Sequence, residues 1–110
     1  MVKYVPEKGD IVWINFEPQK GHEITKTRPA VVLSPSNYNL KSTLALFVPI
    51  TSSIKGYPFE VLVEYNNISG AVLCDQIRSM DWKERKVTKI TSLESKLLNE
   101  ILSKIRVFLM

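Results

Sequence analysis

The chain has 110 residues, of which 45% are hydrophobic and 24% charged, and its formal net charge is +4. This length favours a single domain over residues 1–110, and no apolar run approaches the ~20 residues that a membrane helix requires. One cysteine allows no internal disulfide and the N-terminus lacks a signal-peptide pattern, so we expect a cytoplasmic protein that does not act in a membrane.

Short apolar segments rich in β-branched and aromatic residues occupy most of the first 90 positions. They predict six strands, at residues 11–16, 30–33, 43–50, 59–63, 71–73 continuing through 76–78, and 87–90. Turn signals such as Gly9, Gly56 and Asn66-Asn67 separate these segments. The spacing indicates a mainly β protein with a strongly bent antiparallel sheet or small barrel.

Arg28 and Pro29 introduce the second predicted strand. Because Pro29 has no N–H and pushes the preceding residue towards an extended conformation, the pair is typical of the first step of a strand. Arg28 is therefore expected at the rim between a polar loop and the core, where a scaffold can hold a guanidinium in place. After this strand, Ser34 and Pro35 predict one helical turn, with Ser34 as N-cap.

The pattern changes to helical spacing after residue 90. Residues 91–94 (TSLE) fit a capping box. The apolar positions that follow recur at helical intervals: Leu97, Leu98, Ile101, Leu102, Ile105, Phe108 and Leu109. These positions predict an amphipathic C-terminal α-helix that lays one face on the sheet.

Several kinds of catalytic site find no support in the sequence. The carboxylates are scattered singly and His22 is the only histidine, so neither a metal site nor a cofactor is predicted. The four glycines lie far apart and form no phosphate-binding loop. Cys74 ends the apolar pattern AVLC and is expected in the core rather than as a nucleophile.

Six motifs, in this order, carry a resemblance to a known family. They are residues 9–13 (GDIVW), 20–23 (KGHE), 28–34 (RPAVVLS), 49–51 (PIT), 55–61 (KGYPFEV) and 75–79 (DQIRS). Together they closely resemble the MazF/PemK family, the toxin halves of bacterial toxin–antitoxin pairs. The resemblance implies an SH3-like barrel with a C-terminal helix (the MazF/CcdB-like fold), in agreement with the pattern of strands and helix.

The function that the resemblance implies is sequence-selective, metal-independent cleavage of single-stranded RNA, chiefly messenger RNA. The 2′-hydroxyl of the substrate attacks the adjacent phosphorus and leaves a 2′,3′-cyclic phosphate and a 5′-hydroxyl. The protein then needs only to orient the phosphate, move two protons and stabilise the extra negative charge. No nucleophilic side chain is required.

The family motifs assign catalytic roles to Arg28, Thr51 and Glu23. Arg28 would stabilise the phosphate and donate a proton, because a guanidinium is a poor general base. Thr51, at the end of the third predicted strand, has a hydroxyl for the phosphate or the 2′-hydroxyl; alternatively it serves only strand propensity. Glu23 either orients Arg28 or contacts a base, and a solvated loop carboxylate is the competing interpretation.

A path for single-stranded RNA needs cations and aromatic faces. Candidate RNA-binding residues are Gln76, Lys20, Lys26, Lys55, Tyr57, Trp13, Arg78 and Trp82. The alternatives are core packing for the tryptophans and plain solvation for the charged loops. Further implied partners are a second copy of the chain, forming a homodimer, and an antitoxin whose acidic disordered tail competes with RNA.

Two other function classes share this fold. CcdB, a non-enzymatic gyrase poison, acts through C-terminal residues, but this chain lacks the terminal Trp-Gly-Ile pattern. A silent SH3-like binding module would leave the combination of Arg28, Thr51 and Gln76 without a purpose.

Overall fold

The computed structural model describes residues 4–16 and 27–110, and within them it contains seven strands and two helices. In chain order these are β1 (Asp10–Asn15), β2 (Thr27–Val32), α1 (Ser36–Ser42), β3 (Leu44–Thr51), β4 (Glu60–Tyr65), β5 (Ile68–Leu73), β6 (Arg78–Asp81), β7 (Thr88–Ser92) and α2 (Ser95–Leu109). Neither helix combines the length and the apolar character that crossing a bilayer requires.

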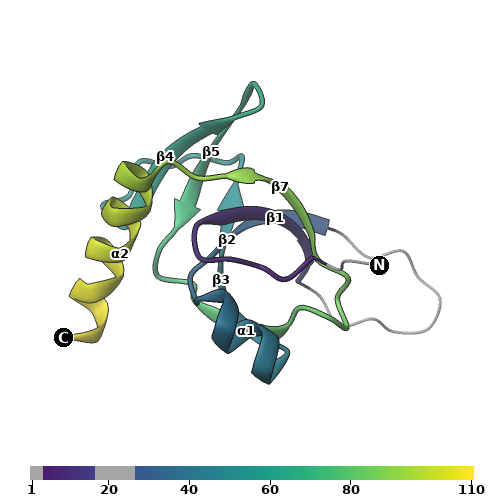
Figure 1. Cartoon of the computed structure of the whole chain (residues 1–110). Coiled ribbons are helices and arrows are strands. Elements are labelled where there is room, and N and C mark those ends of the chain that lie inside the picture. The colour runs from purple at the N-terminus through teal and green to yellow at the C-terminus, as the bar shows by residue number, and fades with distance from the viewer. Residues whose placement is uncertain (1–3, 17–26) are drawn as a thin grey trace.

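The strands form one curled antiparallel sheet in the order β4-β5-β3-β2-β1-β7 (Figure 1). β3, with eight residues, is long enough to pair with two strands along the same side. Its first half pairs with β6, as in Phe47↔Arg78, and its last residues pair with β5, as in Ile50↔Val72. The mainly β architecture with a C-terminal helix confirms the sequence-based prediction of fold class.

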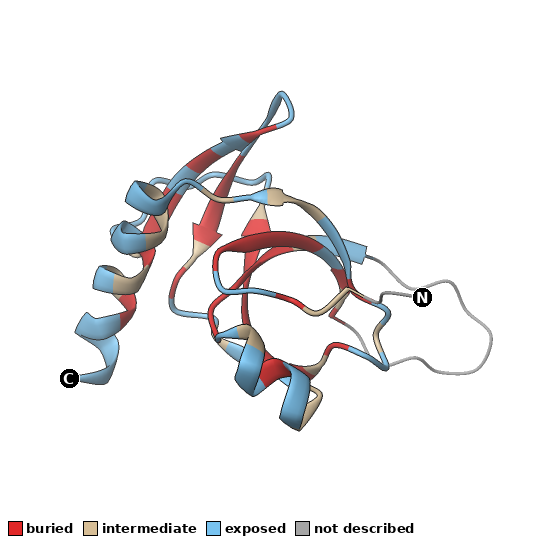
Figure 2. Ribbon diagram, viewed as in Figure 1, coloured by how far each residue is buried: buried red, intermediate tan, exposed pale blue. Residues whose placement is uncertain are grey.

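Two apolar cores lie on the two faces of this sheet because side chains alternate along each strand. The first lies between the sheet and α2 and includes Val31, Val48 and Ile101. The second includes Val32 and Phe47 and is covered by Trp82 and the N-terminal residues Tyr4 and Val5. Figure 2 shows the resulting run of buried residues through the central strands.

The segment predicted as a strand over residues 71–78 is interrupted. β5 ends at Leu73, and the turn that follows is closed by the Gln76 N–H, which donates to the Leu73 carbonyl at 3.1 Å. The strand is interrupted here because β5 and β6 pair with different residues of β3. Cys74, at the start of this turn, is fully buried as predicted, and burial raises the pKa of its thiol to about 11.

Both predicted helix caps are wrong. Ser34 does not cap α1, because its hydroxyl donates to the buried Asn39 Oδ1 at 2.6 Å and accepts from the Leu46 N–H at 2.9 Å. Thr91 and Ser92 cannot form a capping box because they are the last residues of β7; α2 begins three residues later, at Ser95.

The apolar face of α2 covers the sheet only along its first three turns. Ile101 and Ile105 are buried, and Leu97, Leu98 and Leu102 pack partly against the same core. Phe108 and Leu109, predicted as part of that face, are exposed at the end of the helix (Figure 2). The surplus of apolar surface that the sequence predicts at the C-terminus is therefore present.

Asn39 is a fully buried polar residue of α1, next to Trp82 of the second core, and it joins three separate segments. Its fully buried amide donates to the carbonyl oxygens of Pro6 at 2.8 Å and Ser34 at 3.0 Å. Its own carbonyl accepts from Trp82 Nε1 at 2.8 Å. Trp82 is thus a core residue, and its suggested role as a platform for RNA bases is wrong.

Candidate active site

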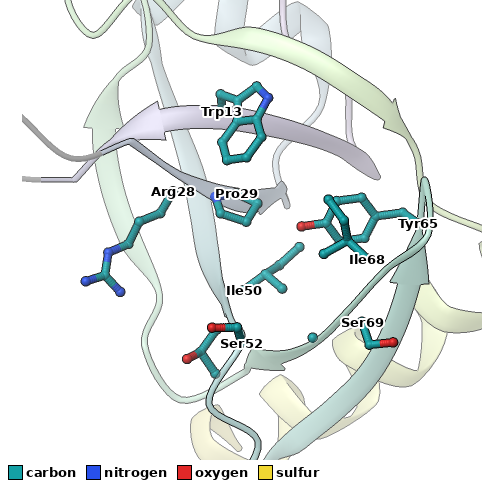
Figure 3. Close-up of a pocket in the computed structure, with 10 residues that line it drawn as sticks. Trp13, Arg28, Pro29, Ile50, Ser52, Tyr65, Ile68 and Ser69 are labelled. Atoms are coloured by element: carbon teal, nitrogen blue, oxygen red, sulfur yellow. The ribbon is translucent and has the colours of Figure 1, made fainter.

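A cleft of about 380 Å³ opens where the ends of β2 and β3 diverge (Figure 3). The residues that line it come from β1 to β5: Trp13, Arg28, Pro29, Ile50, Thr51, Ser52, Tyr65, Ile68, Ser69 and Gly70. Three residues predicted from the sequence, Trp13, Arg28 and Thr51, are therefore brought together. We call this hollow the Arg28–Thr51 cleft.

The divergence of β2 and β3 follows from their register. The pairing runs Val32↔Phe47, Val31↔Val48 and Ala30↔Pro49, and it ends there. The Leu33 N–H donates to the Leu46 carbonyl, and Pro29, four residues earlier on the same side of β2, has no N–H to donate to β3, so the ladder loses a donor at this point. Continued by two positions, the same register sets Arg28 opposite Thr51, on a shared face of the two strands.

The wall formed by β1 and β2 carries the aromatic and cationic groups. Trp13 pairs with Pro29 in the register of the two strands, and its indole is 40% exposed, so it does not fill the core. Arg28 is exposed and its guanidinium extends away from Trp13 (Figure 3). Among residues 4–16 and 27–110, no carboxylate forms an ion pair with Arg28.

The opposite wall orients the Thr51 hydroxyl. Thr51 Oγ1 accepts from the Ser53 N–H at 3.1 Å. A hydroxyl that accepts one hydrogen bond keeps its own proton for donation. Thr51 is thus prepared to donate towards an anion in the cleft.

Gly70 allows β5 to pass close beneath this wall. A Cβ atom at position 70 would lie 2.7 Å from Ile50 Cγ2 and 3.0 Å from the Thr51 carbonyl oxygen. Real Cβ atoms essentially never come within 3.0 Å of another heavy atom, so the contact with Ile50 could form only if Ile50 shifted. The absence of a side chain at Gly70 therefore sets the position of the two β3 residues that line the cleft.

The β4–β5 hairpin completes the cleft with Tyr65 and Ile68, which are paired across its turn. The turn residues Asn66 and Asn67 have φ of 47° and 63°, the left-handed values that a two-residue hairpin turn requires. Tyr65 is only 7% exposed, and its hydroxyl points into the cleft (Figure 3). Burial raises the pKa of this phenol, so it is protonated at neutral pH.

Lys55 and Tyr57 lie on the loop between β3 and β4, which leaves the cleft at Ser52. The buried carboxylate of Glu60 fixes this loop, because its Oε1 accepts from the Lys55 N–H at 3.2 Å and the Gly56 N–H at 3.0 Å. Both Lys55 and Tyr57 are exposed, and neither lines the cleft itself.

The remaining predicted site residues are not in the cleft. Gln76 is exposed in the turn after β5. Arg78 begins β6, and its guanidinium carbon lies 5.5 Å from the centre of the Phe16 ring. Lys20, Glu23 and Lys26 lie outside the described residues.

The family model for the PemK-like, MazF-like toxins of type II toxin–antitoxin systems matches residues 7–109. The chain belongs to this family. The match covers every residue of the Arg28–Thr51 cleft. It confirms the resemblance found in the sequence.

Two curated relatives from Escherichia coli show how close the match is. The endoribonuclease toxin MazF of strain K12 is 44% identical over 107 residues, which cover 97% of this chain and 96% of the relative. The endoribonuclease PemK is 31% identical over 108 residues, covering 94% of this chain and 81% of the relative.

Solved structures of the family share the fold. A crystal structure of MazF from Deinococcus radiodurans superposes with a TM-score of 0.87 at 44% identity, over 97% of this chain and 98% of that one. A MazE–MazF structure from the same organism gives a TM-score of 0.88 at 44% identity, over 97% of both chains.

Sequence reasoning missed Tyr65, Ser69 and Gly70 as cleft residues. One signal was available, because a two-residue Asn-Asn turn predicts that Tyr65 and Ile68 face each other across a hairpin. No sequence pattern indicates that this hairpin reaches the end of β3, since that depends on the pairing of β5 with Ile50 and Thr51.

Proposed function

We propose that this member of the MazF-like family is the endoribonuclease toxin of a toxin–antitoxin pair, and that it cleaves single-stranded RNA, chiefly messenger RNA, at selected sequences. One observation carries the proposal: Arg28 and Thr51 come from different strands and line the same cleft. The MazF and PemK relatives, named as endoribonucleases, support it further, and they favour it over a CcdB-like gyrase poison.

In the proposed reaction the 2′-hydroxyl oxygen of the RNA forms a bond to the adjacent phosphorus, and the bond from phosphorus to the 5′-oxygen breaks. The products are a 2′,3′-cyclic phosphate and a 5′-hydroxyl, so a general base, which the family resemblance leaves open, takes one proton from the 2′-oxygen, and one proton reaches the 5′-oxygen. The Arg28 guanidinium stabilises the added negative charge on the non-bridging oxygens and is a proton donor. The Thr51 hydroxyl donates to the same phosphate. Glu23 orients Arg28 or contacts a base.

The reaction asks for no cofactor, because the substrate supplies the nucleophile. Within the described part of the chain, no three His, Cys, Asp or Glu side chains gather into a group that suits a metal ion. Because the RNA supplies its own nucleophile, cleavage is expected to persist when divalent metals are chelated.

The RNA strand is proposed to cross the cleft beside Trp13, whose exposed indole offers a face for an unstacked base. It would continue along the β3–β4 loop, where Tyr57 and Lys55 are exposed. Lys20, Lys26, Gln76 and Arg78 are proposed as more distant contacts.

The proposed partners follow from the same assignment. A MazE–MazF complex is known for the Deinococcus radiodurans relative. We expect this chain likewise to bind a cognate antitoxin, in the cytoplasm, through an acidic tail that competes with RNA. The exposed apolar residues Val107, Phe108 and Leu109 support a homodimer, which sedimentation analysis can test.

Primer extension on a long single-stranded RNA in EDTA tests the catalytic assignment. The wild type is expected to give discrete stops, and Arg28→Ala and Thr51→Ala to lower cleavage by about two to three decades each. Arg106→Ala, which removes an exposed arginine outside the cleft, is the matched control and should cleave normally. Stops that persist in both cleft variants would refute the site. A folded wild type without stops would favour gyrase poisoning or a binding role.

A further inference from the structure

Tyr65 presents a polar group that the proposed chemistry does not use. The residue is 93% buried, yet its hydroxyl points into the Arg28–Thr51 cleft (Figure 3). Across residues 4–16 and 27–110 this hydroxyl has no hydrogen-bond partner, whereas the hydroxyl of Tyr4 donates to Asp10. Every fully buried side-chain oxygen of the described residues has a hydrogen-bond partner. Because the Tyr65 hydroxyl has none, it must be accessible to solvent. The Tyr65 hydroxyl is therefore open to a ligand in the cleft.

The surroundings of this hydroxyl are mainly apolar. Trp13 is 40% exposed and Ile68 is 44% exposed; Figure 3 shows Ile68 on the same side of the cleft as Tyr65, and Trp13, Pro29 and Ile50 across from them. The Arg28 guanidinium extends away from this end of the cleft. An apolar slot with one hydrogen-bonding group suits a flat heteroaromatic ring better than a phosphate, which needs cations.

The size of the cleft supports one nucleotide rather than a duplex. Its volume of about 380 Å³ is near the lower limit of the range typical for small-molecule sites. A base turned out of a single strand offers both a ring face and a hydrogen-bonding edge.

We propose that the Tyr65 end of the cleft is a nucleobase subsite, in which the Tyr65 hydroxyl hydrogen-bonds the edge of one base and Ile68 and Trp13 contact its faces. The inference rests on the proposed endoribonuclease function and deepens it, because it makes Tyr65 a determinant of the cut sequence. Since burial raises the pKa of this phenol, it acts as a hydrogen-bond donor and acceptor and not as a phenolate base.

Tyr65→Phe tests the subsite because it removes only the hydroxyl and leaves the ring that packs in the core. Tyr38→Phe is the matched control, since Tyr38 is an exposed tyrosine of α1 outside the cleft. Both variants and the wild type are incubated with a random-sequence single-stranded RNA pool in EDTA, and the 5′-hydroxyl ends are mapped. Rates are then measured on short RNAs that differ at one base.

Tyr65→Phe is expected to relax the base preference at one position of the cut sequence and to lower kcat/KM on the preferred RNA about tenfold. The kcat/KM on RNAs that differ from the preferred sequence should fall little. The melting temperature of the variant should match that of the wild type. Tyr38→Phe should leave rate and sequence preference unchanged. An unchanged preference in Tyr65→Phe, whether the rate is normal or uniformly lower, would overturn the subsite.

A binding measurement separates this inference from the proposed function. Fluorescence anisotropy with four short single-stranded 2′-deoxy oligonucleotides, each rich in one base, requires no cleavage. The wild type is expected to distinguish the four bases, and Tyr65→Phe to reduce the difference. If the wild type fails to cleave RNA, the proposed function is wrong, and the binding series still decides the subsite. Equal binding of all four oligonucleotides by the wild type would overturn it.

Discussion

Gly70→Ala probes how tightly the end of β3 is fixed in the cleft. The new Cβ would lie 2.7 Å from Ile50 Cγ2 and 3.0 Å from the Thr51 carbonyl oxygen. Gly70 is not among the glycines with positive φ, so alanine fits its backbone and would by itself stabilise the fold by ~0.4–1 kcal/mol. Overpacking of this kind costs ~1–3 kcal/mol. Overpacking dominates because one neighbour is a β-branched side chain only 4% exposed and the other is backbone.

The expected result is a net loss of about 1–2 kcal/mol in the free energy of unfolding, measured by urea denaturation. A loss of this size leaves most of the protein folded at the assay temperature and would by itself change the cleavage rate little. The rate should nevertheless fall clearly, because Thr51 is displaced in the folded variant. Ile50→Leu removes the clashing Cγ2 methyl at nearly constant volume, so the double variant should recover part of both losses. Equal or higher stability of Gly70→Ala, or strictly additive effects of the two substitutions, would refute the reasoning.

Two further substitutions test buried polar anchors, one in the loop next to the cleft and one beside the second core. Glu60→Ala removes the acceptor of two loop N–H groups, so RNA affinity should fall several-fold with little change in kcat. Glu60→Gln keeps one side-chain oxygen and should lower the affinity less. An equal loss of affinity in the two variants would contradict the anchoring role. Asn39→Leu leaves buried carbonyl oxygens without donors and should lower the free energy of unfolding by ~2–4 kcal/mol in urea denaturation. The exposed Asn99→Ala is its control and should change stability little.

Local patterns in the sequence predicted the elements of this fold well. The strand period, the turn residues and the helical spacing after residue 90 each depend on neighbouring positions, and the structure has strands and a helix there. The caps failed because tertiary contacts compete for the same groups. Ser34 illustrates this competition, since its hydroxyl binds the buried Asn39 instead of a helix N–H.

The cleft was predictable only where its residues lie close to strand ends. Arg28 is the second residue of β2 and Thr51 is the last residue of β3, and the family motifs named both. Tyr65 reaches the cleft because β5 pairs with the last residues of β3 and brings its hairpin along, a contact between distant segments. Trp82 shows the opposite error, a residue predicted for the site that is not there. From the sequence alone it suits base stacking as well as Trp13 does, but in the structure its N–H donates to a buried carbonyl.

The position of the Arg28–Thr51 cleft follows from the point at which the β2–β3 ladder ends. Further residue pairs beyond Ala30↔Pro49 would close the gap, but Pro29 lacks the N–H that the next hydrogen-bonded position of β2 would donate to β3. The end of β3 is held from its other side instead, by Ile50↔Val72 and Thr51↔Ala71. The two strands can therefore diverge without leaving the end of β3 unsupported. Arg28 and Thr51 keep the shared face that their register gives them, and the space between their strands is left for a substrate.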